Sequence, residues 1–194
     1  MLLLKIIFFL SLFCIFHSYV LYPFIIRLLS LNKKPNQIRY SHDTSLPLVS
    51  TMVAIYNEEK VIEEKLMTLL KSNYPKDKIQ IYVGSDCSSD GSNEIVSNLA
   101  KAYDNLHFFA FEDRSGKPGV LNKLSRIIFE KRAKASDHLL LMTDANVMLE
   151  KDTIFHLAKH FKNTEIAIVD ANMTNVGEQK EGISRSEKTY ISSE

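Results

Sequence analysis

The chain has 194 residues, of which 45% are hydrophobic and 24% charged, and its formal net charge is +1. This composition suffices for one full-sized globular domain and a short additional segment. The near-neutral charge, without a run of five or more like charges, argues against nucleic-acid binding. Cys14 lies in an apolar segment and Cys87 in a polar one, so the two thiols predict no disulfide framework and favour a reducing compartment for the globular part.

The N-terminal segment is predicted to be a transmembrane helix. From Ile6 to Ile26 there is no Asp, Glu, Lys or Arg, and this stretch of about 21 residues would span roughly 30 Å as a helix, the thickness of a bilayer core. A cleaved signal peptide is the alternative, but the apolar run is longer than usual and no small-residue cleavage site follows it. His17, Ser18 and Pro23 are tolerable interruptions. We therefore expect residues 1–31 to anchor the chain in a lipid bilayer.

The charges beside this anchor predict its orientation. Lys5 alone precedes the apolar run, whereas several cations follow it: Arg27, Lys33, Lys34 and Arg39. The positive-inside rule then places the remainder of the chain in the cytoplasm, at the plasma or inner membrane if the source is bacterial. Residues 32–46, which are polar and contain Pro35, are expected to form a linker.

Residues 47–194 are predicted to alternate between strands and helices. Residues 48–56 are uncharged and rich in β-branched side chains, as in a strand that is buried on both faces. Asn57 is predicted to be the N-cap of the following helix, with Glu58 and Glu59 in its first turn. Later segments repeat the pattern, with strands expected at 79–83, 106–111, 138–142 and 166–169 and helices after 91, at 117–131 and at 153–161. This alternation predicts an α/β fold with a doubly wound, mostly parallel sheet.

Polar side chains follow the ends of several predicted strands, where open α/β sheets bind ligands. The turn at 56–59 could be only a helix start, but a helix N-terminus at this edge also suits a phosphate or the edge of a base. Asp86 comes directly after the second strand, too early to cap the next helix, so we expect it to contact a nucleoside. Asp90, with Ser89, is expected to be that cap.

A basic loop occupies residues 114–119. Two glycines and a proline hold Arg114 and Lys117 close together, although the sequence of a P-loop is missing. Two cations at the start of a helix are unfavourable for the helix dipole unless an anion neutralises them. A diphosphate is the anion that this loop predicts.

Asp144 and Asn146 bracket one small residue after the strand predicted at 138–142. Carboxylate and amide oxygens on such a short arc suit Mg²⁺ or Mn²⁺ shared with phosphate groups. Alone the tripeptide is a weak signal, because it also occurs by chance in many turns.

The four elements together resemble the family 2 glycosyltransferases, over about residues 48–175. That family has the GT-A fold, a Rossmann-like sheet, and the resemblance implies inverting transfer from a nucleoside-diphosphate sugar, often a UDP-sugar. Segment 53–59 is similar to the family's first nucleotide-binding strand and turn, and 83–90 to its second. Segment 114–122 is similar to the basic loop beside the diphosphate, and 143–146 stands at the metal-binding Asp-x-Asp. The implied donor residues are Ala54, Tyr56, Glu58, Asp86, Arg114 and Lys117, with Asp144 and Asn146 as ligands of the divalent cation.

The chain also departs from the family pattern. Asn146 replaces the usual second Asp, which implies weaker metal binding. No residue can be named as the catalytic base: the only Glu-Asp pair, Glu112-Asp113, lies upstream of the basic loop, Asp170 is explained more simply as a cap, and there is no Trp for the family's Gln-x-x-Arg-Trp motif. We therefore expect the sequence to be an N-terminal fragment that carries the donor half of the site.

The expected protein is a membrane-anchored glycosyltransferase for polysaccharide or glycan synthesis, with a glycan or lipid-linked acceptor and no nucleic-acid partner. A second hypothesis is a non-catalytic nucleotide-binding or assembly module, which needs no catalytic base. A third, a sugar nucleotidyltransferase, would require a glycine-rich loop after the first strand, and residues 56–59 contain no glycine.

Overall fold

The structure is a computed structural model that describes residues 1–31, 35–41, 45–132 and 137–171. The chain divides into two compact units, Met1–Gln37 and Ile38–Glu194. Each unit is described by itself. The α/β domain predicted over residues 47–194 includes residues 172–194, which lie outside the described residues.

The first unit contains one long apolar helix, Leu2–Ser30. It consists of α1 (Leu2–Phe16), a π-helical turn (His17–Leu21) and α2 (Tyr22–Ser30). By length and composition, Leu2–Ser30 is able to cross a membrane. The backbone N–H of Tyr22 bonds to the carbonyl of His17, five residues earlier, directly before Pro23, which has no N–H to donate. The wider turn thus accommodates the proline without ending the helix.

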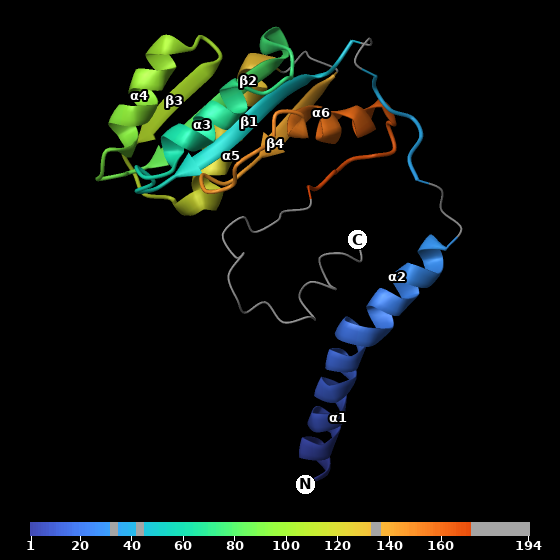
Figure 1. The fold of residues 1–194 in the computed structure, drawn as a ribbon. Coiled ribbons are helices and arrows are strands. Elements are labelled where there is room, and N and C mark those ends of the chain that lie inside the picture. The colour runs from blue at the N-terminus through green and yellow to red at the C-terminus, as the bar shows by residue number, and fades with distance from the viewer. Residues whose placement is uncertain (32–34, 42–44, 133–136, 172–194) are drawn as a thin grey trace, which may run out of the picture. The chain divides into compact units, whose positions relative to one another are not determined.

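The second unit is built on a four-stranded parallel sheet (Figure 1). Its strands are β1 (Leu48–Ile55), β2 (Ile79–Asp86), β3 (Leu106–Phe111) and β4 (His138–Met142), in the order β3-β2-β1-β4. In the register, Val53 pairs with Val83, and Met52 pairs with Met142. The carboxyl ends of β2, β1 and β4 therefore lie side by side, and the residues that follow them share one edge of the sheet.

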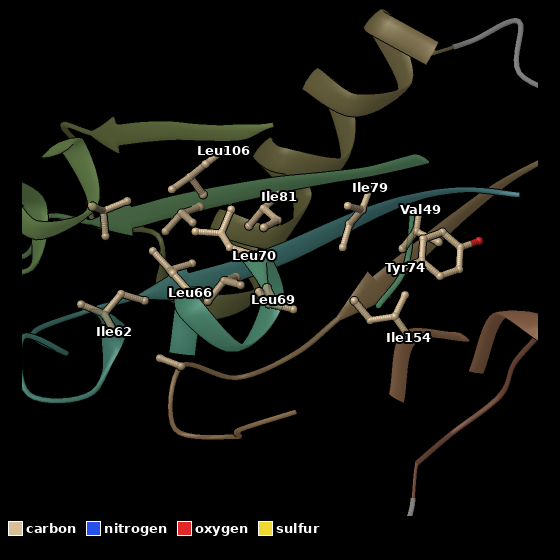
Figure 2. Packing of buried hydrophobic residues seen from close by; sticks show 14 of the residues in the cluster. Val49, Ile62, Leu66, Leu69, Leu70, Tyr74, Ile79, Ile81, Leu106 and Ile154 are labelled. Atoms are coloured by element: carbon tan, nitrogen blue, oxygen red, sulfur yellow. The ribbon is translucent and has the colours of Figure 1, made fainter. Parts of the chain in front are cut away.

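Helices cover both faces of this sheet, as the doubly wound prediction requires. On one face, α3 (Ile62–Leu70), α4 (Ser92–Ala102) and α6 (Thr153–Ala158) contribute to the larger buried cluster (Figure 2). That cluster includes Val49, Leu66, Ile81, Val96 and Ile154. Helix α5 (Gly116–Arg132) covers the other face.

The second buried cluster joins α5 to the sheet through Val120, Leu124 and Ile128, which pack with Met52 and Tyr82. Gly84 of β2 allows this close approach. A Cβ atom added at Gly84 would lie 2.5 Å from Cγ1 of Val120, so any larger residue would force the helix away from the strand.

Two sequence predictions about the elements are wrong. Asn57 is not a helix N-cap, because α3 begins at Ile62 after the cap residue Val61, and Asn57 has a left-handed φ of 55°. Glu63 and Glu64, rather than Glu58 and Glu59, therefore occupy the first helical turn.

The fifth strand, predicted at 166–169, is also wrong, since these residues are described without strand pairing. The N–H of Ile166 bonds instead to the carbonyl of Asn163 and makes a turn. Ile168 is 86% exposed, so this apolar run has no sheet face to bury it. The helix predicted at 153–161 is shorter than expected and continues as a 3₁₀ turn, Lys159–Lys162.

Candidate functional site

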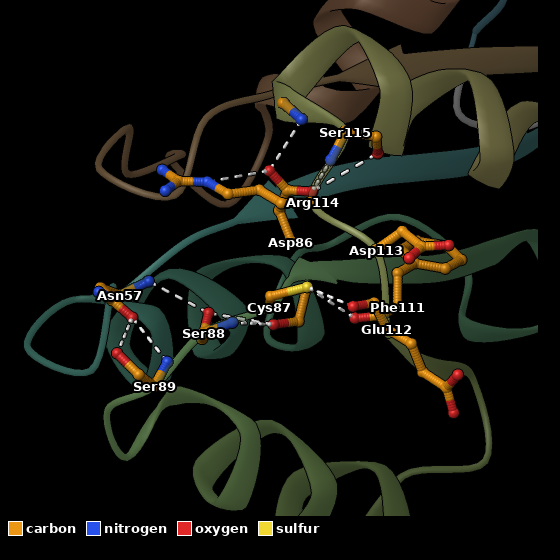
Figure 3. Close-up of polar contacts among 12 residues, drawn as sticks. Asn57, Asp86, Cys87, Ser88, Ser89, Phe111, Glu112, Asp113, Arg114 and Ser115 are labelled. Carbon is orange, nitrogen blue, oxygen red and sulfur yellow. Dashed lines mark hydrogen bonds and ion pairs between the residues drawn. The ribbon is translucent and has the colours of Figure 1, made fainter.

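The predicted site residues lie at the carboxyl ends of β1, β2 and β4 and at the N-terminus of α5. Asp86 is at the centre of this group and is 4% exposed. Its Oδ1 accepts a hydrogen bond from the backbone N–H of Ser115 (2.6 Å), and its Oδ2 accepts one from Gly116 (2.9 Å) (Figure 3). The carboxylate thus binds the free amides and the positive end of the dipole of α5.

The sequence alone does not predict that Asp86 caps α5. The sequence rightly excludes Asp86 as a cap of α4, which begins at Ser92. It does not reveal a cap on α5, which starts some thirty residues later. Gly116 has a φ of +69°, a conformation that glycine adopts without strain, and this turn directs its N–H at Asp86.

Arg114 connects Asp86 to Tyr56. Its Nε lies 3.9 Å from Oδ2 of Asp86, and its guanidinium carbon lies 3.8 Å from the centre of the Tyr56 ring. The Arg114 side chain is 63% exposed and Tyr56 is 40% exposed. The structure therefore brings three of the predicted donor residues into one contiguous group, in which Arg114 and Tyr56 are exposed and Asp86 is buried beneath them.

Lys117 forms an ion pair with Asp144 through its Nζ and the carboxylate Oδ1. Both side chains are about half exposed. The two cations of the basic loop thus each face a carboxylate of the protein itself, Arg114 facing Asp86 and Lys117 facing Asp144. Carboxylates of the protein therefore supply the neutralisation for which the sequence pattern suggests an external anion, and the contact with a diphosphate stays a prediction.

In the turn that contains Asp144 and Asn146, exposed and buried side chains alternate. Both residues are exposed, whereas Ala145 between them is 4% exposed and belongs to the larger cluster. Within the described residues, no group of three or more His, Cys, Asp or Glu side chains could hold a metal ion. A cation shared with phosphates needs only one or two protein ligands. The oxygens of Asp144 and Asn146 fit that kind of site and not one made of protein ligands alone.

Lys65 is a residue near the site that sequence reasoning missed. It lies on α3, is fully buried, and its Nζ donates to Oγ1 of Thr143 (2.7 Å) and to the carbonyl of Val147. Burial lowers its pKa to about 8, and the nearby charge of Asp144 opposes this decrease. The only available sequence signal was a lysine at a position of α3 that faces the core.

A network of hydrogen bonds joins the turn after β1 to the turn after β2. Oδ1 of Asn57 accepts from the backbone N–H of Ser89 (2.9 Å), and the N–H of Asn57 donates to Oγ of Ser88 (3.1 Å) (Figure 3). The N–H of Glu58 donates to Oγ of Ser92 (2.8 Å). Two turns that flank Tyr56 and Asp86 are therefore fixed to each other.

Asp90 completes this network. Its Oδ2 accepts from the N–H of Glu59 (3.1 Å) and its Oδ1 from the N–H of Ser92 (3.0 Å). Desolvation would raise the pKa of the Asp90 carboxyl, but hydrogen bonds from Ser92 and from the Glu59 backbone produce a net decrease. Asp90 thus binds the start of α4, as expected, although the residue at the N-cap position itself is Gly91.

Cys87 follows Asp86 with a left-handed φ of 60°. Its Sγ donates to the carbonyls of Phe111 (3.2 Å) and Glu112 (3.0 Å). The thiol is free, as is that of exposed Cys14, in agreement with the predicted absence of a disulfide framework. Cys87 therefore joins the end of β2 to the loop after β3.

The remaining predicted donor residues lie on the same edge. Ala54 is partly buried near the end of β1, where it pairs with Gly84, and Glu58 is partly exposed in the turn that follows. The ligand contacts assigned to all these residues stay predictions. Asp170 accepts a hydrogen bond from the backbone N–H of Ala171, but the strand whose end it was expected to cap is not formed at 166–169.

Comparison with known proteins gives consistent similarities. A family model described as glycosyl transferase family 2 matches residues 50–193. The beta-monoglucosyldiacylglycerol synthase of Trichormus variabilis is 28% identical over 138 residues, which cover 70% of this chain and 28% of that protein. The poly-beta-1,6-N-acetyl-D-glucosamine synthase of Staphylococcus epidermidis is 30% identical over 125 residues, 64% of this chain and 28% of that protein.

Among solved structures, the mannosyltransferase PcManGT from Pyrobaculum calidifontis, in complex with GDP-Man and Mn²⁺, is similar with a TM-score of 0.57 and 28% identity. The match covers 73% of this chain and 39% of that one. The present chain thus spans only part of the length of the proteins that it matches.

Proposed function

Because this chain belongs to glycosyl transferase family 2, we propose that its α/β unit binds the nucleoside-diphosphate sugar donor of an inverting glycosyl transfer reaction. One observation carries the proposal: Tyr56, Asp86 and Arg114 come from three separate segments and meet at the edge where the strands end. Lys117 and Asp144 pair at the same edge. An aromatic ring, a carboxylate and two cations are the groups that a base, a ribose and a diphosphate require.

The nucleoside part of the donor is assigned to Ala54, Tyr56, Glu58 and Asp86. A carboxylate can accept about four hydrogen bonds, and two backbone amides occupy only part of the capacity of Asp86. The Arg114 guanidinium and the Ser115 hydroxyl also face this carboxylate, and a ribose hydroxyl or a base N–H would take an acceptor position that remains. Tyr56 is partly exposed, so a base can stack against its ring. The donor is proposed to be a UDP-sugar, as in much of the family.

The diphosphate part is assigned to the basic loop. Arg114 and Lys117 are the cations that would contact phosphate oxygens and stabilise charge on the departing diphosphate. Asp144 and Asn146 would hold Mg²⁺ or Mn²⁺, which when bound supplies further neutralisation of that charge. Exchange of Lys117 from Asp144 to the diphosphate would make the carboxylate available at the same time.

The proposed setting is a membrane. The helix Leu2–Ser30 has the length and composition of an anchor, and the basic residues after it favour a cytoplasmic α/β unit. The relatives named above synthesise a glucosyl diacylglycerol and a polysaccharide, according to their names. A glycan or lipid-linked acceptor is therefore proposed for the whole protein, in which this chain provides the donor half of the site.

The test is calorimetric titration of the full chain, in detergent micelles, with UDP and with GDP, each with and without Mn²⁺. The proposal predicts binding that Mn²⁺ strengthens and that Asp144→Ala weakens. Asp113→Ala is the matched control, because Asp113 is an exposed carboxylate of the loop before α5 with no assigned ligand. If neither nucleotide binds under any condition, the chain is not a donor site, and the non-catalytic assembly module becomes the better hypothesis.

A further inference from the structure

Lys65 is unusual because it is a lysine with no exposed surface. Lysine is almost never fully buried unless its ammonium group is paired. Here the Nζ donates to Oγ1 of Thr143 (2.7 Å) and to the main-chain carbonyl of Val147. The side chain thus connects α3, in the larger buried cluster, to the loop after β4.

The two acceptors stand at opposite ends of the turn that contains Asp144 and Asn146. Other bonds of this turn are longer: the N–H of Thr143 lies 3.3 Å from the carbonyl of Met52, and that of Val147 lies 3.3 Å from the carbonyl of Asp144. Ala145 anchors the middle of the turn in the core. The Lys65 ammonium therefore connects the two ends of the turn as a bridge on its buried side.

An apolar side chain at this position would pack in the same cluster without the cost of burying a charge. That cost is evident in the pKa of Lys65, which burial lowers to about 8. The same apolar side chain would leave the Val147 carbonyl and the Thr143 hydroxyl without their donor. The benefit of the lysine is therefore the fixed conformation of the turn and not packing.

We propose that Lys65 is a positioning residue, which holds residues 143–147 so that the side-chain oxygens of Asp144 and Asn146 face the donor diphosphate together. This inference rests on the proposed function for its consequence in ligand binding. The bridge itself belongs to the nucleotide-free protein. Lys65 touches neither the donor nor the cation and acts only through the turn.

The positive charge of Lys65 and its bridging hydrogen bonds have opposite effects on cation binding. An ammonium close to Asp144 repels a divalent cation bound there, so loss of the charge alone would strengthen cation binding. Loss of the bridge would weaken it. The sign of the change in Mn²⁺ affinity therefore separates a positioning role from a purely electrostatic one.

The first measurement is amide hydrogen exchange of the turn in the full chain without nucleotide. Lys65→Met retains the length of the side chain and removes the donor, and exchange of peptides covering 143–148 should become faster by about tenfold. Ile62→Val is the matched control, because Ile62 is equally buried on α3 and has no hydrogen bond to the turn. Equal exchange in the two variants would overturn the proposal.

A second variant keeps the test informative if Lys65→Met does not fold. Thr143→Val removes one acceptor of the bridge with little change of shape, whereas Thr143→Ser retains the hydroxyl. The proposal predicts faster exchange of the turn in Thr143→Val and exchange close to wild type in Thr143→Ser. Equal behaviour of these two variants would contradict a role for the Lys65–Thr143 bond.

The second measurement is UDP binding with and without Mn²⁺. Lys65→Met should weaken the Mn²⁺-dependent part by roughly tenfold, as for residues that orient metal ligands, and leave metal-free UDP binding unchanged. The double variant with Thr143→Val should bind no more weakly than Lys65→Met alone, since Lys65→Met already removes the Lys65–Thr143 bond that Thr143→Val removes. Unchanged or stronger Mn²⁺ affinity would overturn the proposal. If wild type binds no nucleotide, the proposed function fails, while hydrogen exchange still decides whether Lys65 fixes the turn.

Discussion

Lys117, in the first turn of α5, forms an ion pair with Asp144, in the loop after β4. The pair joins a residue assigned to the diphosphate to a residue assigned to the cation. Because both side chains are half exposed, the pair contributes little to stability and can separate when a ligand supplies better partners. Because the two side chains are paired, binding of a cation at Asp144 and binding of a diphosphate at Lys117 should depend on each other.

Lys117→Met is predicted to change cation and nucleotide binding in opposite directions. Freed from its partner, Asp144 should bind Mn²⁺ alone up to about fivefold more tightly, which corresponds to the roughly 1 kcal/mol of an exposed pair. Binding of UDP with Mn²⁺ should weaken by about tenfold through the lost phosphate contact. Isothermal titration measures both values.

Lys123→Met is the matched control for this prediction. Lys123 lies on the same helix, and its substitution removes the same charge. Its Nζ lies over the ring of Phe111, 4.7 Å from the ring centre. Titrations of the control should resemble wild type. Identical Mn²⁺ affinity in the two lysine variants would show that the Lys117–Asp144 pair does not limit access to the carboxylate.

Asp86→Asn is predicted to destabilise the α/β unit by about 1–3 kcal/mol. The amide keeps one acceptor oxygen but loses the second acceptor and the negative charge at the N-terminus of α5. Thermal unfolding followed by circular dichroism should show a lower Tm than for Asp113→Asn, which changes an exposed carboxylate of the loop before α5. A Tm equal to that of the control would mean that Asp86 does not stabilise the start of α5.

Asn57 supplies a test of the link between the first two turns. Asn57→Gly retains the left-handed backbone and removes the bond to Ser89, so a loss of about 1 kcal/mol is expected. Asn57→Ala removes the same bond and also strains the backbone, which adds on the order of 1 kcal/mol. Urea unfolding of both variants gives the comparison. If alanine is tolerated as well as glycine, the left-handed conformation is not required.

The free energy of unfolding should depend on pH through Lys65. Below its folded pKa of about 8, both the folded and the unfolded protein hold the proton. Between about 8 and the ordinary value of 10.5, only the unfolded chain holds it, so stability rises with pH in this range by up to about 3 kcal/mol. Stability relative to Lys65→Met should therefore increase across this window. Parallel pH profiles of the two proteins would contradict the lowered pKa.

Local patterns in the sequence predicted the architecture and the position of the site, and long-range contacts account for what they missed. Uncharged, largely apolar runs identified β1 to β4, and the polar residues after β1, β2 and β4 identified the edge where the site lies. The role of Asp86 as a cap of α5 depends on a partner thirty residues away, and no local pattern contains it.

The predictions that were wrong or missing also depend on contacts between segments far apart in the sequence. Asn57 has the side chain of an N-cap, but its hydrogen bond goes to Ser89 on the neighbouring turn, and α3 begins five residues later. Ile166 to Val169 has the composition of a strand but no strand partner among the described residues. Lys65 resembles a surface lysine of a helix until its burial against the turn at 143–147 is seen.

The most direct test of the donor site locates the bound nucleotide. Hydrogen exchange of the full chain should be compared with and without UDP and Mn²⁺ at saturating concentrations. The account predicts protection in peptides that contain Tyr56, Asp86, Arg114 to Lys117 and Asp144, with the rest of the sheet unchanged. Binding without protection at these four segments, or protection confined to another face of the unit, would contradict the proposed donor site.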